Sequence, residues 1–469
     1  MRRSTLAFWL SSFSIIVAQD PQQGSTSAGV LAAQFAARLD VLCQPLVDAE
    51  VAVGFVVGIV DGDASLVRGY GRVDPSSDRA PDAATVYEIG SISKVFTGLL
   101  LADAITRGEV AADDRVQKWL PAGITLPRTE VNEVLLWHLS AHVSGLPRLP
   151  DGESPDPQNP YAHMDRVAVY AAASKSLLRN EPGSTYEYSN LAAGLLGQLL
   201  VDRAGVASFE ALLAQRVTGP LSMADTVVEL TPVLRERFAP PFAADLASDH
   251  EWDLAALAGA GGIRSTMRDM LAFASAQCST PADAGLAKSI ARSHEKQKEL
   301  PGGAGIALGW HLARGGAVLW HNGETGGFHS YLAVQPGKAR AICILCNTAT
   351  ATVDALGERV LMLLGGGEPK PLKLERPVAV DRETLQRYVG VYEVKDGVAM
   401  AVTVRERGLY AQISGQPSLR LFARSETEFF YRQVQATVAF QVDGGACSGL
   451  ELRQGGSAST WKKLAQRMR

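Results

Sequence analysis

The sequence lacks an excess of either charge and any long run of one sign. Its 469 residues carry 45 Lys and Arg against 49 Asp and Glu, which gives a formal net charge of −4. No basic stripe or Lys/Arg-rich run is present. Because nucleic acids and anionic membrane surfaces are bound through clustered positive charge, we expect neither as a partner.

Cysteine is scarce as well. The chain has five cysteines, an odd and widely spread set that does not resemble a disulfide framework. Cys343 and Cys346 fall in a predicted strand, where residues three apart point to opposite faces, so we expect no bond between them. No second Cys/His pair follows at metal-ligand spacing, and we therefore predict no metal centre.

The N-terminus has the order of a secretory signal. Arg2 and Arg3 precede an apolar stretch at residues 6–17, and the small residue Ala18 follows. We expect cleavage there, with residues 1–18 as a signal peptide and the mature protein periplasmic or secreted. An uncleaved anchor is the alternative, but the apolar stretch is short for a bilayer, so no stable membrane span is expected.

The rest of the chain alternates between strand and helix patterns. Residues 29–46 have helical periodicity, and residues 51–60 and 65–70 form a predicted hairpin around Asp61, Gly62 and Asp63. Helical segments dominate residues 91–221. Strand patterns return at residues 306–312, 317–320, 328–334 and 341–345, before a closing helix at residues 353–364. This order predicts an α+β fold whose one sheet is assembled from both ends of the chain.

A second unit follows this sheet. The Gly/Pro-rich stretch at residues 365–371 is typical of a linker, and short alternating runs separated by Gly/Asp-rich turns come after it. We predict a first domain at residues 28–365, a linker at residues 366–383 and a small antiparallel β-barrel-like accessory domain at residues 384–469. The sequence indicates no oligomeric state.

One Ser-x-x-Lys pair has the setting of a nucleophile with its own base. Ser91 and Lys94 lie one helical turn apart, so their side chains share a face. The apolar residues around them would desolvate the amine, lower its pKa and activate the hydroxyl. The same spacing recurs at Ser293/Lys296 and Ser459/Lys462, where we predict solvated surface.

Two further segments carry polar groups that suit acyl transfer. Tyr188 and Asn190 stand on a turn before an apolar helix, where a hydroxyl could relay a proton and an amide could hold a substrate carbonyl. His321 begins the Gly-rich segment that ends at Tyr331, where glycines permit close approach of a substrate and edge N–H groups could bind an oxyanion.

Together these segments resemble the serine β-lactamase and penicillin-binding family, most closely the class C β-lactamases and the related DD-peptidases and esterases. The family's F-E-x-G-S-x-S-K is matched from Tyr87, its Y-x-N from Tyr188, and its K-T-G-x-T-G-G-F-x-S-Y from His321, where His-Asn-Gly replaces Lys-Thr-Gly. The resemblance covers roughly residues 28–365. It implies a β-lactamase/transpeptidase-like fold, with an antiparallel sheet flanked by helices and a helical subdomain.

The resemblance also implies the roles of individual residues. Ser91 would be acylated, with Lys94 and Tyr188 as proton carriers and no metal or organic cofactor. The backbone N–H groups of Ser91 and Glu324 would form the oxyanion hole, each worth on the order of 100-fold in rate. The remaining residues implied in substrate binding are Asn190, His321, Asn322, Gly323 and Glu324.

Three functions are compatible with these residues, and they differ in substrate or in turnover. Small-molecule β-lactams or D-Ala-type amides are the first choice, hydrolysed through a Ser91 acyl-enzyme. Neutral acyl esters are the alternative, favoured because His321 replaces a lysine, Glu324 adds a carboxylate beside it, and Leu149 stands where class C enzymes have a glutamine. A penicillin-binding or sensing module that is acylated without turnover is the third.

Overall fold

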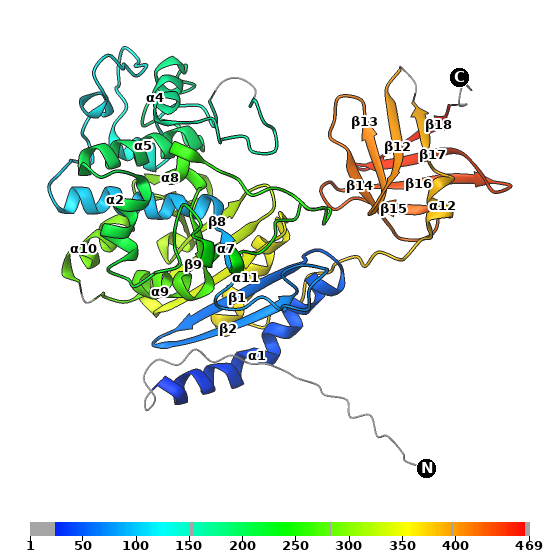
Figure 1. Cartoon of the computed structure of the whole chain (residues 1–469), viewed down its shortest axis with the longest axis horizontal. Helices are drawn as coiled ribbons and strands as arrows, with labels where there is room; N and C mark the ends of the chain where they lie inside the picture. Colours follow the sequence, from blue (N-terminus) through cyan, green and yellow to red (C-terminus); the bar gives the residue numbers. More distant parts are fainter. Residues whose placement is uncertain (1–23, 151–153, 282, 395–396, 465–469) are drawn as a thin grey trace.

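The computed structural model describes residues 24–150, 154–281, 283–394 and 397–464. The predicted signal peptide at residues 1–18 lies outside the described residues. Figure 1 shows a larger α+β body and a β-barrel joined by an extended segment. These two parts correspond in kind to the sheet domain and the small β-domain that the sequence predicts.

An eight-stranded antiparallel sheet forms the centre of the larger part, in the order β2-β1-β10-β9-β8-β7-β6-β5. Early and late segments meet in its middle, where Phe55 pairs with Cys346, so the sheet is assembled from both ends of the chain. The strands are β1 (Gly54–Asp61), β2 (Ala64–Gly71), β5 (Lys298–Glu299), β6 (Gly305–Ile306), β7 (His311–Ala313), β8 (Val318–Glu324), β9 (His329–Gln335) and β10 (Arg340–Cys346).

The single strand predicted at residues 306–312 is wrong. The chain turns back between β6 and β7, so that Ile306 pairs with His311 and Ala307 N–H donates to the Trp310 carbonyl at 2.8 Å. Gly309 in this turn has φ +74°, and a methyl group there would lie 2.2 Å from the Lys94 carbonyl. The hairpin therefore packs tightly against the helix that carries Lys94.

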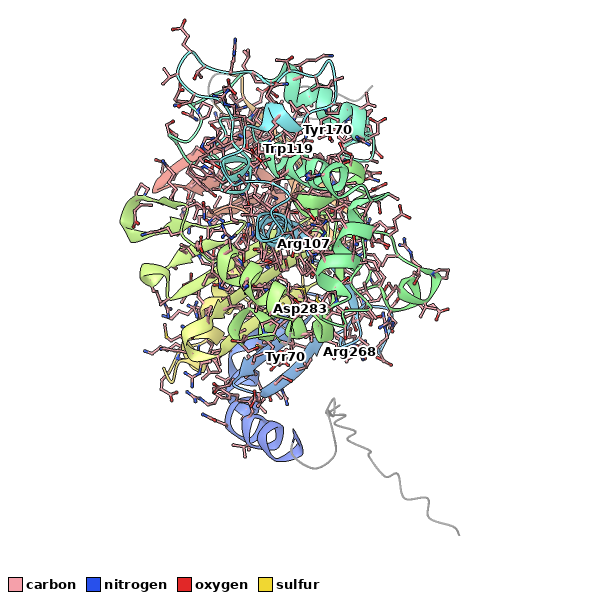
Figure 2. All side chains as sticks on the ribbon, turned by 90° about the vertical axis from the view of Figure 1, so that its left-hand side faces the viewer. Tyr70, Arg107, Trp119, Tyr170, Arg268 and Asp283 are labelled. Atoms are coloured by element: carbon pink, nitrogen blue, oxygen red, sulfur yellow. The ribbon has the colours of Figure 1, made fainter. Side chains whose placement is uncertain are left out.

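Two helices cover one face of the sheet, α1 (Gly24–Asp48) and α11 (Thr352–Leu364). Figure 2 labels Tyr70 where β2 meets α1, and its hydroxyl donates to Asp40 Oδ1 at 2.9 Å. By length and composition residues 29–48 are apolar enough to cross a membrane. In this fold Phe35 and Leu39 of α1 are instead buried against the sheet, which accounts for the apolar stripe.

Helices α2 (Ser93–Thr106), α9 (Met267–Cys278) and α10 (Ala284–Ser293) lie on the other face. Thr266 caps α9 by accepting from Asp269 N–H at 3.3 Å. The two-stranded sheet β3 (Val86–Glu88) and β4 (Arg264–Thr266) precedes α2 and α9. The other helices and short turns are α3 (Leu136–Ser140), α4 (Arg166–Lys175), α5 (Asn190–Ala204), α6 (Phe209–Leu213), η3 (Ala214–Thr218), α7 (Pro232–Arg237), η4 (Ala255–Leu257), α8 (Ala258–Gly261), η2 (Val116–Trp119), η5 (Pro301–Gly303), η6 (Arg314–Gly316) and η7 (Pro336–Lys338).

The two faces of β10 confirm the expected separation of its cysteines. Cys343 belongs to the core on the α2/α9 side, whereas Cys346 belongs to the core on the α1/α11 side. All five cysteines are free. Within the described part of the chain, no three His, Cys, Asp or Glu side chains cluster as a metal site would require.

The C-terminal part is a closed antiparallel barrel with its own core. Tyr388 stacks on Phe440 with ring centroids 4.2 Å apart, and the Tyr392 hydroxyl donates to the Tyr388 carbonyl at 2.7 Å. Its elements are α12 (Arg382–Gln386), β11 (Gly390–Glu393), β12 (Ala399–Arg405), β13 (Gly408–Ile413), β14 (Leu419–Ala423), β15 (Glu428–Phe430), β16 (Ala436–Asp443), β17 (Ala446–Gln454) and β18 (Ser457–Lys463). The barrel thus closes the edge that an open sheet would leave unpaired.

Candidate active site

Ser91 stands on a tight turn at the start of α2. It lies in the 3₁₀ turn η1 (Gly90–Ile92), which runs directly into the helix. Gly90 adopts φ +50°, a conformation that glycine tolerates best, and this redirects the chain from β3 into the turn. The Ser91 Oγ and Lys94 Nζ atoms are 3.0 Å apart. The shared face expected from their spacing is therefore formed, although Ser91 belongs to the turn and not to the helix.

Lys94 is almost completely buried, with 2% of its surface exposed. Its Nζ donates to the Ala260 carbonyl at 2.5 Å, and no carboxylate of the described residues pairs with it. Burial is the main cause that holds the Lys94 pKa well below its usual value, and the positive charge of Arg148 acts in the same direction. Burial therefore favours the neutral amine, the form that can accept a proton from Ser91.

Tyr188 completes a triangle with these two residues. Its ring centroid lies 4.7 Å from Lys94 Nζ, and its hydroxyl lies near that of Ser91. Burial raises the Tyr188 pKa above its usual value, so the phenol keeps its proton at neutral pH. The next residue fixes the geometry, since Ser189 caps α5 by accepting from Ala192 N–H at 3.0 Å and donates to the Pro147 carbonyl at 2.6 Å.

Asn190 opens α5 beside Tyr188. Its side-chain Oδ1 is buried and has no hydrogen-bond partner among the described residues. The Tyr161 hydroxyl lies beside the same amide and is affected by it, although burial is the larger influence on the Tyr161 pKa. A buried amide oxygen without a partner is costly unless a ligand satisfies it, which marks Asn190 as a binding group.

Strand β8 brings two backbone N–H groups together. A methyl group at Gly323 would lie 2.0 Å from the Ile89 carbonyl and 2.9 Å from Ser91 N. One at Gly90 would lie 2.7 Å from Glu324 N. The nitrogen atoms of Ser91 and Glu324 thus lie across a contact that only glycine permits, as an oxyanion hole requires.

The side chains of Asn322 and Glu324 leave on the other face of β8. Asn322 Nδ2 donates to Asp354 Oδ2 at 2.8 Å, and Glu324 Oε2 lies 3.1 Å from His329 Nδ1. His329 Nε2 in turn bonds Asp354 Oδ1 at 2.8 Å. Strand alternation separates this network from Ser91, so the structure brings the Glu324 backbone to the site and turns its carboxylate away.

His321 lies on the Ser91 side of β8 and is buried, with its ring centroid 6.3 Å from that of Tyr188. Nδ1 donates to the Asn322 carbonyl at 2.5 Å, while the buried Nε2 has no partner among the described residues. Burial is the main cause that lowers its pKa, with His311 and Lys94 adding to it. The imidazole is therefore neutral, and Nε2 carries a lone pair.

Two residues near Tyr188 went unrecognised in the sequence. The Arg148 guanidinium lies 5.1 Å from the Tyr188 ring centroid, and the Arg148 carbonyl accepts from Asn190 N–H at 2.9 Å. His142 also packs against the tyrosine, with ring centroids 4.4 Å apart. No motif in the sequence marks Arg148, which directly follows Pro147.

The other Ser-x-x-Lys pairs differ from Ser91/Lys94. Ser293 is fully buried and donates to the Ile290 carbonyl at 2.8 Å, so the expected solvated surface is wrong for this serine. Lys296 is about half exposed and pairs with Glu299. Ser459 accepts from Trp461 Nε1 at 2.9 Å on a barrel strand. Neither pair combines a free hydroxyl with a buried amine.

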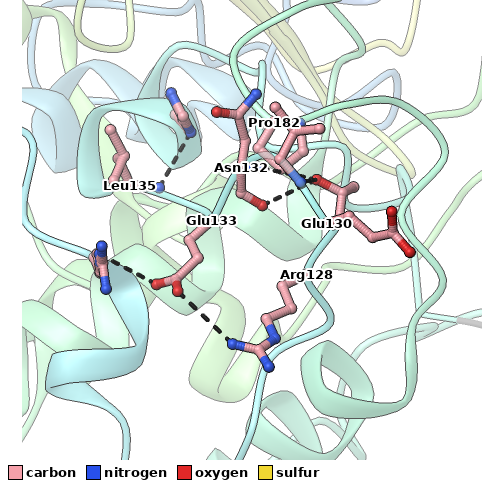
Figure 3. A pocket seen from close by; sticks show the side chains of 10 residues that line it. Arg128, Glu130, Asn132, Glu133, Leu135 and Pro182 are labelled. Carbon is pink, nitrogen blue, oxygen red and sulfur yellow. Dashed lines mark hydrogen bonds and ion pairs between the residues drawn. The ribbon is translucent and has the colours of Figure 1, made fainter.

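A cavity of about 770 Å³ lies away from Ser91, with Pro182 and Leu135 on its walls (Figure 3). Glu133 lies 3.4 Å from Arg115 and 4.0 Å from Arg128, so these three charged side chains of the cavity lining pair with one another. None of the residues predicted for catalysis lines it. The size of this cavity therefore does not identify the active site, which is defined by the chemistry around Ser91.

Comparison with known proteins gives two family matches. The family model described as Beta-lactamase matches residues 39–366. A second model, described as a domain of unknown function (DUF3471), matches residues 374–463. The first covers the sheet and its helices, and the second covers the barrel strands.

Similar curated proteins include the D-alanyl-D-alanine-carboxypeptidase/endopeptidase AmpH of Escherichia coli (strain K12). It is 29% identical over 349 residues, which span 68% of this chain and 86% of the relative. A penicillin-binding protein of Bacillus subtilis (strain 168) is 25% identical over 442 residues, spanning 86% of this chain and 93% of the relative.

Solved structures share the fold at lower identity. A beta-lactamase/D-alanine carboxypeptidase from Yersinia pestis, complexed with citrate, has a TM-score of 0.62 at 23% identity and covers 73% of this chain and 100% of its own. A class C beta-lactamase mutant has a TM-score of 0.63 at 20% identity and covers 72% and 99%. Both matches support the β-lactamase/transpeptidase-like fold.

Proposed function

The chain belongs to the beta-lactamase family of serine hydrolases, and on this premise we propose that it hydrolyses β-lactams or D-Ala-type amides through an acyl-enzyme on Ser91. The observation that carries this proposal is the triangle of Ser91, the neutral Lys94 and the protonated Tyr188. It supplies a nucleophile, a base and an acid within contact of one another.

Acylation begins when Lys94 Nζ takes the proton of the Ser91 hydroxyl, and Oγ attacks the substrate carbonyl carbon. The carbonyl oxygen becomes an oxyanion that the Ser91 and Glu324 N–H groups stabilise. As the bond between carbonyl carbon and leaving nitrogen breaks, the Tyr188 hydroxyl gives the nitrogen a proton. Tyr188 regains a proton from Lys94, which returns to its neutral form.

Deacylation reverses these roles with water as the nucleophile. A water molecule gives a proton to the Tyr188–Lys94 pair and attacks the ester carbonyl, and the Ser91 oxygen leaves with a proton from Lys94. His321 Nε2 is buried without a partner among the described residues, and its lone pair is an acceptor that orients Tyr188 or the water.

Arg148 supports the choice of carboxylate-bearing substrates. Burial lowers the pKa values of Lys94, His142 and His321 and favours their neutral forms, whereas a guanidinium keeps its charge. Arg148 thus supplies the positive charge that the replacement of the motif lysine by His321 removes. The relatives' names, a carboxypeptidase and a penicillin-binding protein, agree with substrates of this kind.

A carboxylesterase activity on neutral acyl esters is the second candidate. The neutral and buried His321 favours it, since the position that carries a lysine in the family's motif has no charge here. The acidic Glu324 side chain does not disfavour carboxylates, because it turns toward His329. A penicillin-binding module without turnover remains the third candidate, and it requires that the deacylating water be excluded.

We also propose that the protein acts outside the cytoplasm after removal of residues 1–18, with residues 28–365 as the catalytic domain and residues 384–469 as an accessory domain joined by residues 366–383. The order of charged, apolar and small residues at the N-terminus supports export. N-terminal sequencing of the protein from the periplasmic fraction checks it. A chain that begins at Met1 in the cytoplasm would contradict this localisation.

A chromogenic cephalosporin, a D-Ala-D-Ala peptide and a short-chain nitrophenyl ester, assayed side by side, separate the candidates. Steady turnover of the cephalosporin or the peptide supports the main proposal. Hydrolysis of the ester alone supports the second candidate, and a single stoichiometric burst supports the third. Ser91→Ala is the control, and it should remove activity on all three compounds.

A further inference from the structure

The segment at residues 239–253, called the rim loop here, connects α7 to η4 and lies against the end of the central sheet. Its Phe242 N–H donates to the Gly327 carbonyl at 3.2 Å and to the Asn347 carbonyl at 3.1 Å. Ala349 N–H donates back to the Phe242 carbonyl at 2.9 Å. The base of the rim loop is therefore fixed by backbone hydrogen bonds to the turn after β8 and to the segment after β10.

The rim loop reaches both sides of the active site. A methyl group at Gly326, two residues after the oxyanion N–H of Glu324, would lie 2.7 Å from Trp252 Nε1. The Trp252 ring packs edge-on against Tyr161, with centroids 5.4 Å apart. Tyr161 in turn lies beside the Asn190 amide. Displacement of the rim loop would therefore change the support of both Glu324 and Asn190.

The barrel holds the tip of the rim loop at Asp245. Arg420 Nη1 on β14 donates to the Asp245 carbonyl at 2.8 Å. The Tyr410 hydroxyl on β13 lies beside the Asp245 side chain, and burial, together with this carboxylate, raises the Tyr410 pKa to about 12. In Figure 1 the loop is the green segment that extends to the barrel beside β14. Residues of two barrel strands thus meet one loop residue, Arg420 through its backbone carbonyl and Tyr410 beside its carboxylate.

On the barrel side of this contact, Arg420 is partly buried and packs against an aromatic ring. The Arg420 guanidinium stacks over Phe422 at 4.6 Å from the ring centroid. Burial lowers the Arg420 pKa from its usual value, so the contact is partly removed from water. Hydrogen bonds of a partly desolvated guanidinium are stronger than those on an open surface. Arg420 is therefore suited to holding the loop in one position.

We infer that Asp245, Arg420 and Tyr410 are positioning residues through which the C-terminal barrel holds the rim loop and, with it, the substrate-binding wall of Trp252, Tyr161 and Asn190. The barrel thereby determines how well substrate is bound, although it contributes no reacting group. The effect on substrate rests on the proposed function, whereas the placement of the loop does not.

The test is the double variant Arg420→Met with Tyr410→Phe in the full-length protein, studied by hydrogen exchange and by kinetics. Deuterium uptake of peptides from residues 239–253 should become faster, while the sheet strands keep the wild-type rate. KM for the cephalosporin should rise about tenfold, with kcat within about threefold, since loss of these bonds weakens binding and leaves Ser91 in place. Arg420→Lys, which keeps a donor, should recover part of the effect.

Arg424→Met is the matched control, because Arg424 pairs with Glu375 of the linker and does not touch the loop. It should leave loop exchange and KM as in the wild type. Unchanged exchange in the double variant, or the same change in Arg424→Met, would overturn the inference. Faster exchange with an unchanged KM would overturn the claim that the barrel affects substrate binding. A wild-type protein without turnover would instead count against the proposed function, and the exchange result would still decide the loop placement.

Discussion

The charge on Lys94 decides whether Ser91 can act as a nucleophile. An ammonium could only donate to the hydroxyl, whereas the neutral amine favoured by burial can accept its proton. Arg148 contributes to this neutral state and remains charged itself. At the scale of single residues, burial thus favours an uncharged base at Lys94. The positive charge near the site is that of Arg148, which lies next to the Tyr188 ring.

Arg148→Gln should discriminate between substrates by their charge. For a cephalosporin and its methyl ester, the ratio of kcat/KM values, acid over ester, should fall about 10- to 100-fold, as expected for loss of a charged hydrogen bond. Arg128→Gln removes an exposed positive charge elsewhere and is the control. Equal losses on both substrates would show that Arg148 acts only through Lys94 and would refute carboxylate binding.

Short motifs and their apolar setting were enough to find Ser91, Lys94, Tyr188 and Asn190 as candidates, because these residues lie at or near the starts of helices whose patterns are local. Arg148 was missed for a physical reason. Its importance lies in its 5.1 Å approach to a ring 40 positions further along the chain, which no local pattern encodes.

At the scale of elements, the contact between η1 and β8 positions the two oxyanion donors. The short distance between η1 and β8 depends on Gly323, where a side chain would collide with the Ile89 carbonyl. Strand alternation places His321 and Gly323 on one face of β8. The hairpin of β6 and β7 was not predicted, because an apolar run of seven residues reads as one strand when its tight turn is also apolar.

Gly323→Ala should push η1 and β8 apart. We expect kcat to fall at least about 100-fold, the effect of losing one oxyanion donor, while circular dichroism shows the native fold. Gly337→Ala is the matched control, since it lies between β9 and β10 of the same sheet and a methyl group there meets nothing within 4 Å. Native kcat in Gly323→Ala would mean that the η1–β8 contact does not bind the oxyanion.

The bridge between β9 and α11 makes stability depend on pH. Burial opposes a charge on His329, but hydrogen bonds to Asp354 and Glu324 outweigh it and raise its pKa to about 9. Its stabilisation is fully present below the unfolded pKa near ~6.5 and is lost as the pH rises through about 9.

Urea unfolding at several pH values checks this bridge. The free energy of unfolding should fall by roughly 3 kcal/mol from this residue between pH 6.5 and 9. His329→Gln should be less stable at pH 6 and should lack this part of the decline. A variant whose pH dependence parallels that of the wild type would exclude His329 as the cause.

At the scale of the whole molecule, the barrel has a core of its own around Tyr388, Phe429 and Phe440. Alternating short runs predicted a small β-domain, and the closed barrel confirms that kind of fold. Its contact with Asp245 was beyond prediction, because it joins residues 175 positions apart through one backbone carbonyl. Single-sequence patterns describe what each part buries, but not where two folded parts touch.

Phe440→Ala tests whether the barrel unfolds as a separate unit. Removing this buried ring should destabilise the barrel by about 3–5 kcal/mol. Calorimetry should then show one transition at lower temperature, with the transition of the larger part little changed. A single transition that moves as a whole would mean that the two parts unfold together.

The central claim is that Ser91 forms the acyl-enzyme. Mass spectrometry of the full-length protein, quenched shortly after mixing with a β-lactam, measures this most directly. The account predicts one added β-lactam mass per chain, located on the peptide that contains Ser91, and none in Ser91→Ala. An adduct that persists in Ser91→Ala, or that maps to another residue, would contradict it.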